Sequence, residues 1–167
     1  NDEWKTMALA SFSKSKNIYD KKMNSIYKLT KDGFELDLSF FDYYLFDRQP
    51  HFYNKKLISL FGKPRNKDEK IIDKHHQVAG ALQRAFTNIV FHLLKITKQK
   101  GGKSNNIVIA GGAAMNCVFN GLLENNNTYK NNFIPPWPDD LGVSIGAAYL
   151  ENHNLGKKSK NECQVYL

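Results

Sequence analysis

Residues 107–121 read IVIAGGAAMNCVFNG, and this stretch decides how the surrounding chain is interpreted. An apolar run leads directly into Gly111 and Gly112, and small residues then lead to Asn116 and a second apolar segment. This pattern predicts a short buried strand, a tight turn, and a helix from about residue 113 to residue 124. Because glycine has no Cβ, the backbone at the pair can turn sharply and approach a ligand closely.

A helix that begins just after a glycine turn is a natural seat for phosphate, because its first N–H groups and its dipole favour an anion. Asn116, placed one turn into the expected helix, can offer its side-chain amide to a phosphate or sugar oxygen. The pattern is neither a P-loop nor a GxGxxG fingerprint. A purely structural turn with a buried Asn116 explains the same residues, so both interpretations stay open.

A second stretch, PPWPDDLGVSIGAA at residues 135–148, places Asp139 and Asp140 at the start of a helix expected over 141–152. A carboxylate held between a strand and a helix can bind a metal ion. Acidic residues at this position also serve as helix N-caps, which is the structural alternative. The glycines and alanines of the helix would let it pack closely on another element.

The remaining segments predict an α/β or α+β fold in which helices cover a sheet. A turn at Lys31-Asp32-Gly33 separates alternating segments and predicts a hairpin. The aromatic run FFDYYLFD either extends this hairpin or starts a buried helix. Further expectations are a short helix in NKKLISLFG closed by Gly62, a long helix over 69–99, strands in NNIVIA and FIPPW, one domain over 1–153 and a polar tail over 154–167.

Composition narrows the class of protein. The chain has 167 residues, 41% of them hydrophobic, and a net charge of +8. Its lysines are scattered and no nucleic-acid-binding module is present, so a nucleic-acid partner is not favoured. The opening residues NDEWKTMALA do not have the pattern expected of a secretory signal, no apolar run is long enough for a membrane span, and the distant Cys117 and Cys163 do not suggest disulfides. We expect a reducing, cytoplasmic location, a core position for Cys117 and, since the sequence starts at Asn1, a longer parent protein.

Taken together, several stretches resemble the nodulation-type O-carbamoyltransferase family. GGAAMNCVFNG is similar to the family's GGVALNCVANG, and PPWPDDLGVSIGAA is similar to PPxPGDAGLAIGAA. The resemblance continues in HHQVAGALQ (family HADIAASLQ), DEWKTMALASFS (family GEYKVMGLAPYG) and LFGKPRNKDE (family FGxPRRPxE). The matches keep their order over nearly all of residues 2–150.

The resemblance implies the second lobe of an actin/hexokinase-like ATPase fold with a ribonuclease H-like sheet, related to the enzyme that forms threonylcarbamoyladenosine in tRNA. It implies that carbamoyl phosphate and ATP first give carbamoyladenylate, whose carbamoyl group is then transferred to a hydroxyl of a sugar-like or natural-product acceptor. The first lobe and the carbamoyladenylate-forming domain would be the partners of this chain within the parent protein.

By the same resemblance, Gly111, Gly112 and Asn116 would lie at the nucleotide phosphates, with Glu3 and Lys5 near the nucleoside. Asp140 would help to hold a divalent metal, iron(II) in this family, whose other ligands are an HxxxH pair in the first lobe. The chain departs from the family at Asp139, where the family has glycine, and at Ala8, Ser11 and Ser13, where it has Gly, Pro and Gly. A degenerate, non-catalytic lobe that binds a nucleotide or a partner is therefore the alternative.

Overall fold

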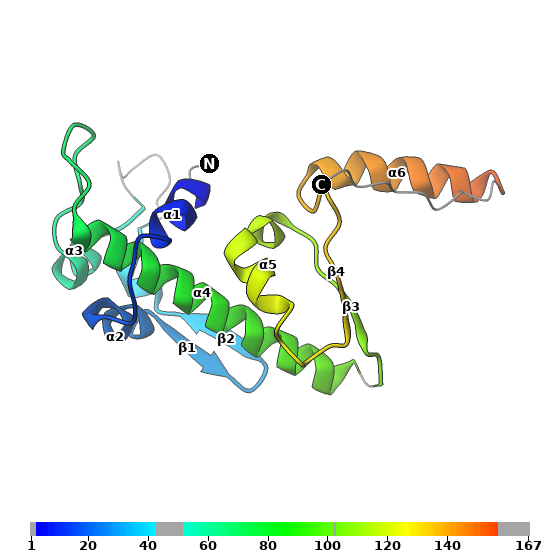
Figure 1. Cartoon of the computed structure of the whole chain (residues 1–167), viewed down its shortest axis with the longest axis horizontal. Coiled ribbons are helices and arrows are strands. Elements are labelled where there is room, and N and C mark those ends of the chain that lie inside the picture. The colour runs from blue at the N-terminus through cyan, green and yellow to red at the C-terminus, as the bar shows by residue number, and fades with distance from the viewer. Residues whose placement is uncertain (1–2, 43–51, 102, 157–167) are drawn as a thin grey trace. The chain divides into compact units, whose positions relative to one another are not determined.

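The computed structural model describes residues 3–42, 52–101 and 103–156. These residues form an α+β fold that divides into two compact units, unit 1 (Asn1–Lys100) and unit 2 (Gly101–Leu167). Figure 1 labels the elements. Unit 1 contains α1 (Glu3–Ala10), α2 (Ile18–Asn24), β1 (Tyr27–Thr30), β2 (Gly33–Leu36), the 3-10 helix η1 (Leu38–Phe40), α3 (Lys55–Phe61) and α4 (Asp73–Lys100). Unit 2 contains β3 (Asn106–Val108), the 3-10 helix η3 (Gly112–Met115), α5 (Cys117–Leu123), β4 (Asn131–Phe133) and α6 (Leu141–Asn154).

Unit 1 is organised around α4, the long helix that its apolar spacing predicted (Figure 1). Both α1 and α2 pack on it. Small buried residues on α4, Ala81 and Ala85, let the apolar side chains of Met23, Ile26 and Phe40 approach the helix closely. The buried Gln83 donates from Nε2 to Thr87 Oγ1 at 3.4 Å, so this polar side chain is satisfied within the helix.

The predicted hairpin is confirmed. β1 and β2 pair antiparallel with Thr30 opposite Gly33, which leaves Lys31 and Asp32 as the turn. His92 of α4 places its Nε2 2.7 Å from the Thr30 carbonyl oxygen, and this contact holds the end of β1 on the helix.

The predicted start of the long helix at residue 69 was wrong, because α4 begins at Asp73. Glu69 instead closes a separate turn, accepting from the Asn66 backbone N–H at 2.9 Å. At the true start, His75 Nδ1 accepts the Ile72 N–H at 3.0 Å. This acceptor role requires an unprotonated Nδ1, and burial together with the neighbouring Lys74 and Arg65 charges lowers the pKa of His75 accordingly.

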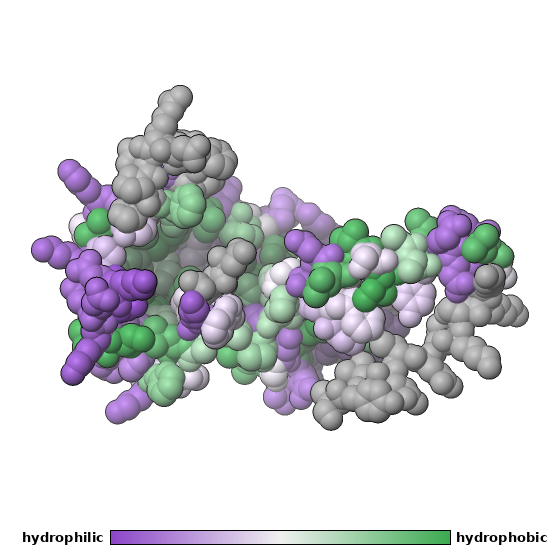
Figure 2. Space-filling view, turned by 90° about the horizontal axis from the view of Figure 1, so that it is seen from above, coloured by the Kyte–Doolittle hydropathy of each residue, from purple (hydrophilic) through white to green (hydrophobic). Residues whose placement is uncertain are grey.

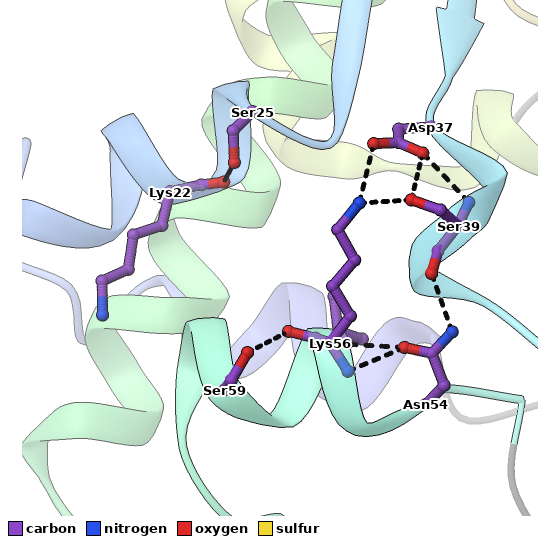
Figure 3. A network of polar contacts seen from close by, with 8 residues as sticks. Lys22, Ser25, Asp37, Ser39, Asn54, Lys56 and Ser59 are labelled. Carbon is purple, nitrogen blue, oxygen red and sulfur yellow. Dashed lines mark hydrogen bonds and ion pairs between the residues drawn. The ribbon is translucent and has the colours of Figure 1, made fainter.

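The helix predicted in NKKLISLFG is confirmed as α3, with Asn54 as its N-cap and Gly62, at φ +84°, at its end. Figure 3 shows the polar network that joins α3 to η1. Asn54 Nδ2 donates to the Ser39 carbonyl at 2.8 Å, and Lys56 Nζ pairs with Asp37 at 3.2 Å and also contacts Ser39 Oγ. Hydrogen bonds from Ser39 lower the pKa of Asp37, which keeps this carboxylate charged.

Two expectations for strands and helices in unit 2 need correction. The strand expected in FIPPW lies earlier, at Asn131–Phe133, because prolines cannot donate to a strand ladder. The helix expected from residue 113 is interrupted at Asn116, with η3 before it and α5 after it.

Within the described ranges the strands form two separate two-stranded sheets. The actin/hexokinase-like lobe with one larger sheet therefore stays a prediction. Most of the run FFDYYLFD, and residues 157–167 of the polar tail, lie outside the described residues.

Gly80 of α4 faces Ser13, which follows α1. A Cβ built on Gly80 would overlap the Ser13 side chain, including its Cβ, more closely than real atoms allow. The Ser13 hydroxyl is buried and has no hydrogen-bond partner among the described residues. The family segment HADIAASLQ has alanine at the Gly80 position, and the family has glycine at the Ser13 position.

We expect Gly80→Ala to lower the free energy of unfolding by about 1–3 kcal/mol through overpacking, although alanine is the better helix former. Adding Ser13→Gly removes both the overlap and the unpartnered hydroxyl, so the double variant should recover most of the loss. Urea unfolding of the two single variants and the double variant measures this coupling. Additive effects of the two substitutions would contradict it.

A bidentate ion pair joins α2 to α4. Arg84 Nε and Nη2 donate to the two carboxylate oxygens of Asp20 at 2.5 and 2.9 Å. Asp20 Oδ2 also accepts the Asn17 N–H, which completes a capping box at the start of α2. The hydrogen bonds from Arg84, and then that from Asn17, lower the pKa of Asp20 although partial burial opposes the shift.

We expect Arg84→Ala to cost about 1–2 kcal/mol of unfolding free energy at pH 7, since the pair is charge-assisted but partly exposed. The folded pKa of Asp20 lies below its unfolded value. The stabilisation is therefore present above the unfolded pKa and is lost as the pH falls through the folded pKa. Urea unfolding at neutral and acidic pH should show the difference between wild type and variant shrinking in acid. Lys100→Ala, which removes a highly exposed ion pair with Asp32, is the control and should change little.

Candidate functional site

The candidate site of unit 2 is built at the ends of two neighbouring parallel strands. β3 and β4 lie side by side (Figure 1). They pair in register, with Val108 opposite Phe133, and the Ile109 N–H extends the ladder to the Phe133 carbonyl at 3.0 Å. Both strands run towards the same edge of the sheet. There the polypeptide leaves each strand and continues towards a helix. In α/β proteins, ligands bind at the carboxyl ends of parallel strands.

A hydrogen bond from Gly111 connects the segment that follows β3 with the segment that follows β4. Its backbone N–H donates to the Pro138 carbonyl oxygen at 2.5 Å, which holds the glycine turn against the segment that leads into α6. Its φ is +95° and its ψ is +164°, a backbone conformation that is open essentially only to glycine. Because this hydrogen bond uses the Gly111 N–H, the contribution of Gly111 to a ligand site would be its missing side chain.

Nothing lies within 4 Å of a Cβ built on Gly111 or on Gly112. The backbone at this turn is therefore open to the approach of another molecule, as the sequence pattern requires of a phosphate-binding turn. Gly112 itself begins η3, and the Ala114 N–H donates back to the Gly111 carbonyl at 2.9 Å.

Asn116 lies at the N-cap of α5 instead of one turn into a helix, as the sequence had suggested. Its Oδ1 accepts the Phe119 N–H at 3.0 Å, so the oxygen supports the helix. Phe119 is the largest fully buried side chain of the described residues. Cys117, expected in the core, is exposed, because it lies about 200° around the helix from Phe119.

Asn120 is a candidate that the sequence interpretation did not single out. Its Nδ2 donates to the Ala114 carbonyl at 2.8 Å, whereas its Oδ1 is buried and has no hydrogen-bond partner among the described residues. The signal was available, since a second asparagine one helical turn after Asn116 falls on the same helix face.

The two neighbouring aspartates have different roles. Asp139 Oδ1 accepts the Leu141 N–H at 3.3 Å and so performs the capping that was the structural alternative. Asp140 immediately precedes α6, but its side chain makes no capping hydrogen bond and is exposed. A Cβ at Gly142 would lie 2.7 Å from the Trp137 carbonyl oxygen, so the glycine permits this tight entry to the helix.

The described structure thus brings Gly111, Gly112, Asn116 and Asp140 into one unit, at adjoining junctions. Glu3 and Lys5 are exposed residues of α1 in unit 1, where Lys5 Nζ lies 5.5 Å from the Trp4 ring centroid. Among the described residues no three His, Cys, Asp or Glu side chains cluster in a way that could hold a metal ion. Asp140 alone does not make an iron site.

The carboxyl ends of these parallel strands, with a glycine turn and the exposed Asp140 carboxylate beside them, form the kind of strand edge at which α/β folds bind ligands. The chain belongs to the family described as carbamoyltransferase N-terminus, whose model matches residues 1–149. It is 32% identical over 173 residues to the uncharacterized protein sll1178 of Synechocystis, covering 99% of this chain and 27% of that protein.

Two nodulation proteins are also similar. Nodulation protein NolO of Bradyrhizobium diazoefficiens is 33% identical over 98 residues, covering 59% of this chain and 18% of that protein. Nodulation protein NolNO of Sinorhizobium fredii is 32% identical over 98 residues, covering 59% of this chain and 14% of that protein. The chain therefore corresponds to a minor part of each of these relatives. None of the helices in the described part of the chain has the length and hydropathy that a membrane span requires.

Alanine substitutions at Gly111 and Gly112 should have different effects on stability. Gly111→Ala places a side chain at a positive φ, and we expect a loss of about 1–3 kcal/mol in unfolding free energy. Gly112→Ala is the matched control, because Gly112 has no positive φ and a Cβ there meets nothing, so its loss should be much smaller. Thermal unfolding followed by circular dichroism measures both. Equal effects would show that the backbone at Gly111 is not constrained as described.

Proposed function

We propose that this chain is part of an O-carbamoyltransferase and forms, over residues 1–153, the second lobe of its actin/hexokinase-like ATPase domain, followed by a polar tail. Membership of the carbamoyltransferase N-terminus family supports the class of reaction. The single observation that carries the site is the hydrogen bond from Gly111 to Pro138, because it brings the glycine turn and the Asp140 junction together.

In this proposal the parent protein transfers a carbamoyl group from carbamoyladenylate, made from ATP and carbamoyl phosphate, to a hydroxyl of a sugar-like or natural-product acceptor. The hydroxyl oxygen would form a bond to the carbamoyl carbon as the bond between that carbon and the phosphate oxygen breaks, so that AMP leaves with the electron pair and the hydroxyl proton passes to water. The side-chain-free turn at Gly111 and Gly112 would admit the phosphate, and the dipoles of the aligned N–H groups that follow would favour its charge.

Asn116 and Asn120 would line the neighbouring wall. The Asn116 Oδ1 is engaged in capping α5, so its role towards the nucleotide would be to hold the turn in place. The buried Asn120 Oδ1 is an acceptor that a ligand hydroxyl or amino group would satisfy. Glu3 and Lys5 would approach the nucleoside.

Asp140 would contribute one oxygen ligand to a divalent metal, with iron(II) as the proposed ion, and polarisation of the carbamoyl carbonyl is the chemistry that such an ion supplies. The residues described here do not form that metal site by themselves, so the first lobe and the carbamoyladenylate-forming domain are the proposed partners. Asp139, which replaces a family glycine, caps α6 and leaves Asp140 uncommitted.

We expect the Asp140→Asn substitution, made in the full-length native protein that contains this chain, to reduce the rate of carbamoyl transfer by about 100-fold or more. The variant should keep its stability, because the Asp140 side chain caps no helix N–H. The assay follows transfer of labelled carbamoyl phosphate to acceptor hydroxyls in the presence of ATP. Asp139→Asn is the control, since an asparagine cap preserves the α6 entry.

Transfer that survives Asp140→Asn would overturn the assigned role of this carboxylate. A native protein that binds nucleotide but never transfers a carbamoyl group would instead support the degenerate, non-catalytic lobe.

A further inference from the structure

A histidine caps the start of α4. His75 is the third residue of this helix, and its Nδ1 accepts the N–H of Ile72, the residue before the helix, at 3.0 Å. The His75 backbone N–H donates in return to the Ile72 carbonyl oxygen at 2.8 Å. In a capping box, a glutamate or glutamine at this third position accepts the N–H of the N-cap residue. His75 performs the same task with a side chain that can take up a proton.

Protonation of His75 would remove this cap. A protonated imidazole has no acceptor nitrogen, so the Ile72 N–H would lose its partner. The new positive charge would also lie in the first turn, where the helix dipole disfavours a cation. Residues 62–73, which lead into α4, are exposed, and the surface at this end of unit 1 is largely hydrophilic (Figure 2). Solvent therefore reaches the segment from which the helix starts.

The surroundings of His75 favour its neutral form. Burial lowers the pKa of His75 most, and the charges of Lys74 on α4 and Arg65 in the preceding turn lower it further. His76 acts in the same direction, whereas the Glu69 carboxylate opposes the shift. The capping form is thus the one that the fold stabilises.

The first turns of α4 also hold the connection between α1 and α2. The ring centroids of His76 and Phe12 lie 5.2 Å apart. Asn17, the N-cap of α2, donates from Nδ2 to the Gln77 carbonyl oxygen at 3.2 Å. Asp73, an acidic residue of the same first turn, contacts Gln77 Nε2. The α1–α2 connection is therefore positioned by the turns of α4 that follow the cap.

We infer that the start of α4 is an acid-sensitive clamp on residues 11–17, which opens when His75 takes up a proton. Loss of the cap lets the first turn of α4 fray, and the contacts with Phe12 and Asn17 loosen with it. Because α1 leads directly into this connection, the clamp controls how firmly the end of α1 is held. The inference does not depend on the proposed reaction, since it concerns the protein without substrate.

Hydrogen exchange followed by mass spectrometry, on the full-length native protein that contains this chain, tests the clamp. Protection of the peptides that cover 72–79 and 11–17 is referred at each pH to the unstructured chain. From about pH 7.5 to about pH 5, on either side of the ordinary histidine pKa, both peptides should lose about threefold to tenfold in protection. The folded pKa of His75 lies below its unfolded value. The clamp is therefore closed above the unfolded pKa and opens as the pH falls through the folded pKa.

His75→Gln supplies an acceptor for the Ile72 N–H that does not titrate, so both peptides should stay protected over the whole pH range. If this variant does not fold, His75→Glu, the other capping-box residue, takes its place. His76→Gln is the matched control, because it removes the neighbouring histidine and leaves the cap. Its 72–79 peptide should respond to acid as that of the wild type does.

Unchanged protection of the wild type in acid, or an equal acid loss in His75→Gln, would overturn the inference. Loss of protection in 72–79 without any loss in 11–17 would show a pH-sensitive cap that clamps nothing, and would overturn it as well. An equal loss in α3 would show unfolding of the whole unit and would also count against the clamp.

Discussion

Gly111 can donate its N–H to the Pro138 carbonyl only in a backbone conformation that residues with a Cβ rarely adopt. This one constraint places the end of β3 against the segment that leads from β4 into α6. The parallel pairing of β3 and β4 brings the two strand ends side by side, and this hydrogen bond adds a contact between the segments that follow them. The site depends on a local backbone conformation at the strand ends, because the surrounding unit buries few side chains of its own.

Sequence patterns predicted an element correctly where the local signal agrees with the packing of that segment in the folded chain. The turn at Lys31-Asp32, the cap and stop of α3 and the long apolar periodicity of α4 are local signals, and the elements appear where they were expected. Errors arose where a side chain redirects the backbone. Glu69 closes its own turn and delays α4, and Asn116 ends η3 by capping the next helix. Such competition between side-chain and backbone hydrogen bonds does not appear in a periodicity pattern.

Sequence patterns predicted the glycine pair and the aspartate pair of the candidate site, but not the role of each residue in them. Glycine after a strand and aspartate before a helix are readable signals, and Asp140 was named from them by resemblance. The sequence did not show which member of each pair has which role. Only the geometry shows that Asp139 performs the capping while Asp140 does not, and that Gly111 is the strained member of the glycine pair. The buried oxygen of Asn120 depends on tertiary packing, so spacing alone could only indicate its helix face.

Departures from the family motifs also take on a physical meaning in the structure. Ser13 stands where the family has glycine, which could indicate a decaying site. However, the Ser13 side chain occupies the space that a Cβ at Gly80 would need, so the serine packs against a position that has no side chain. Asp139 follows the same logic, because the added carboxylate is engaged by the N–H of Leu141.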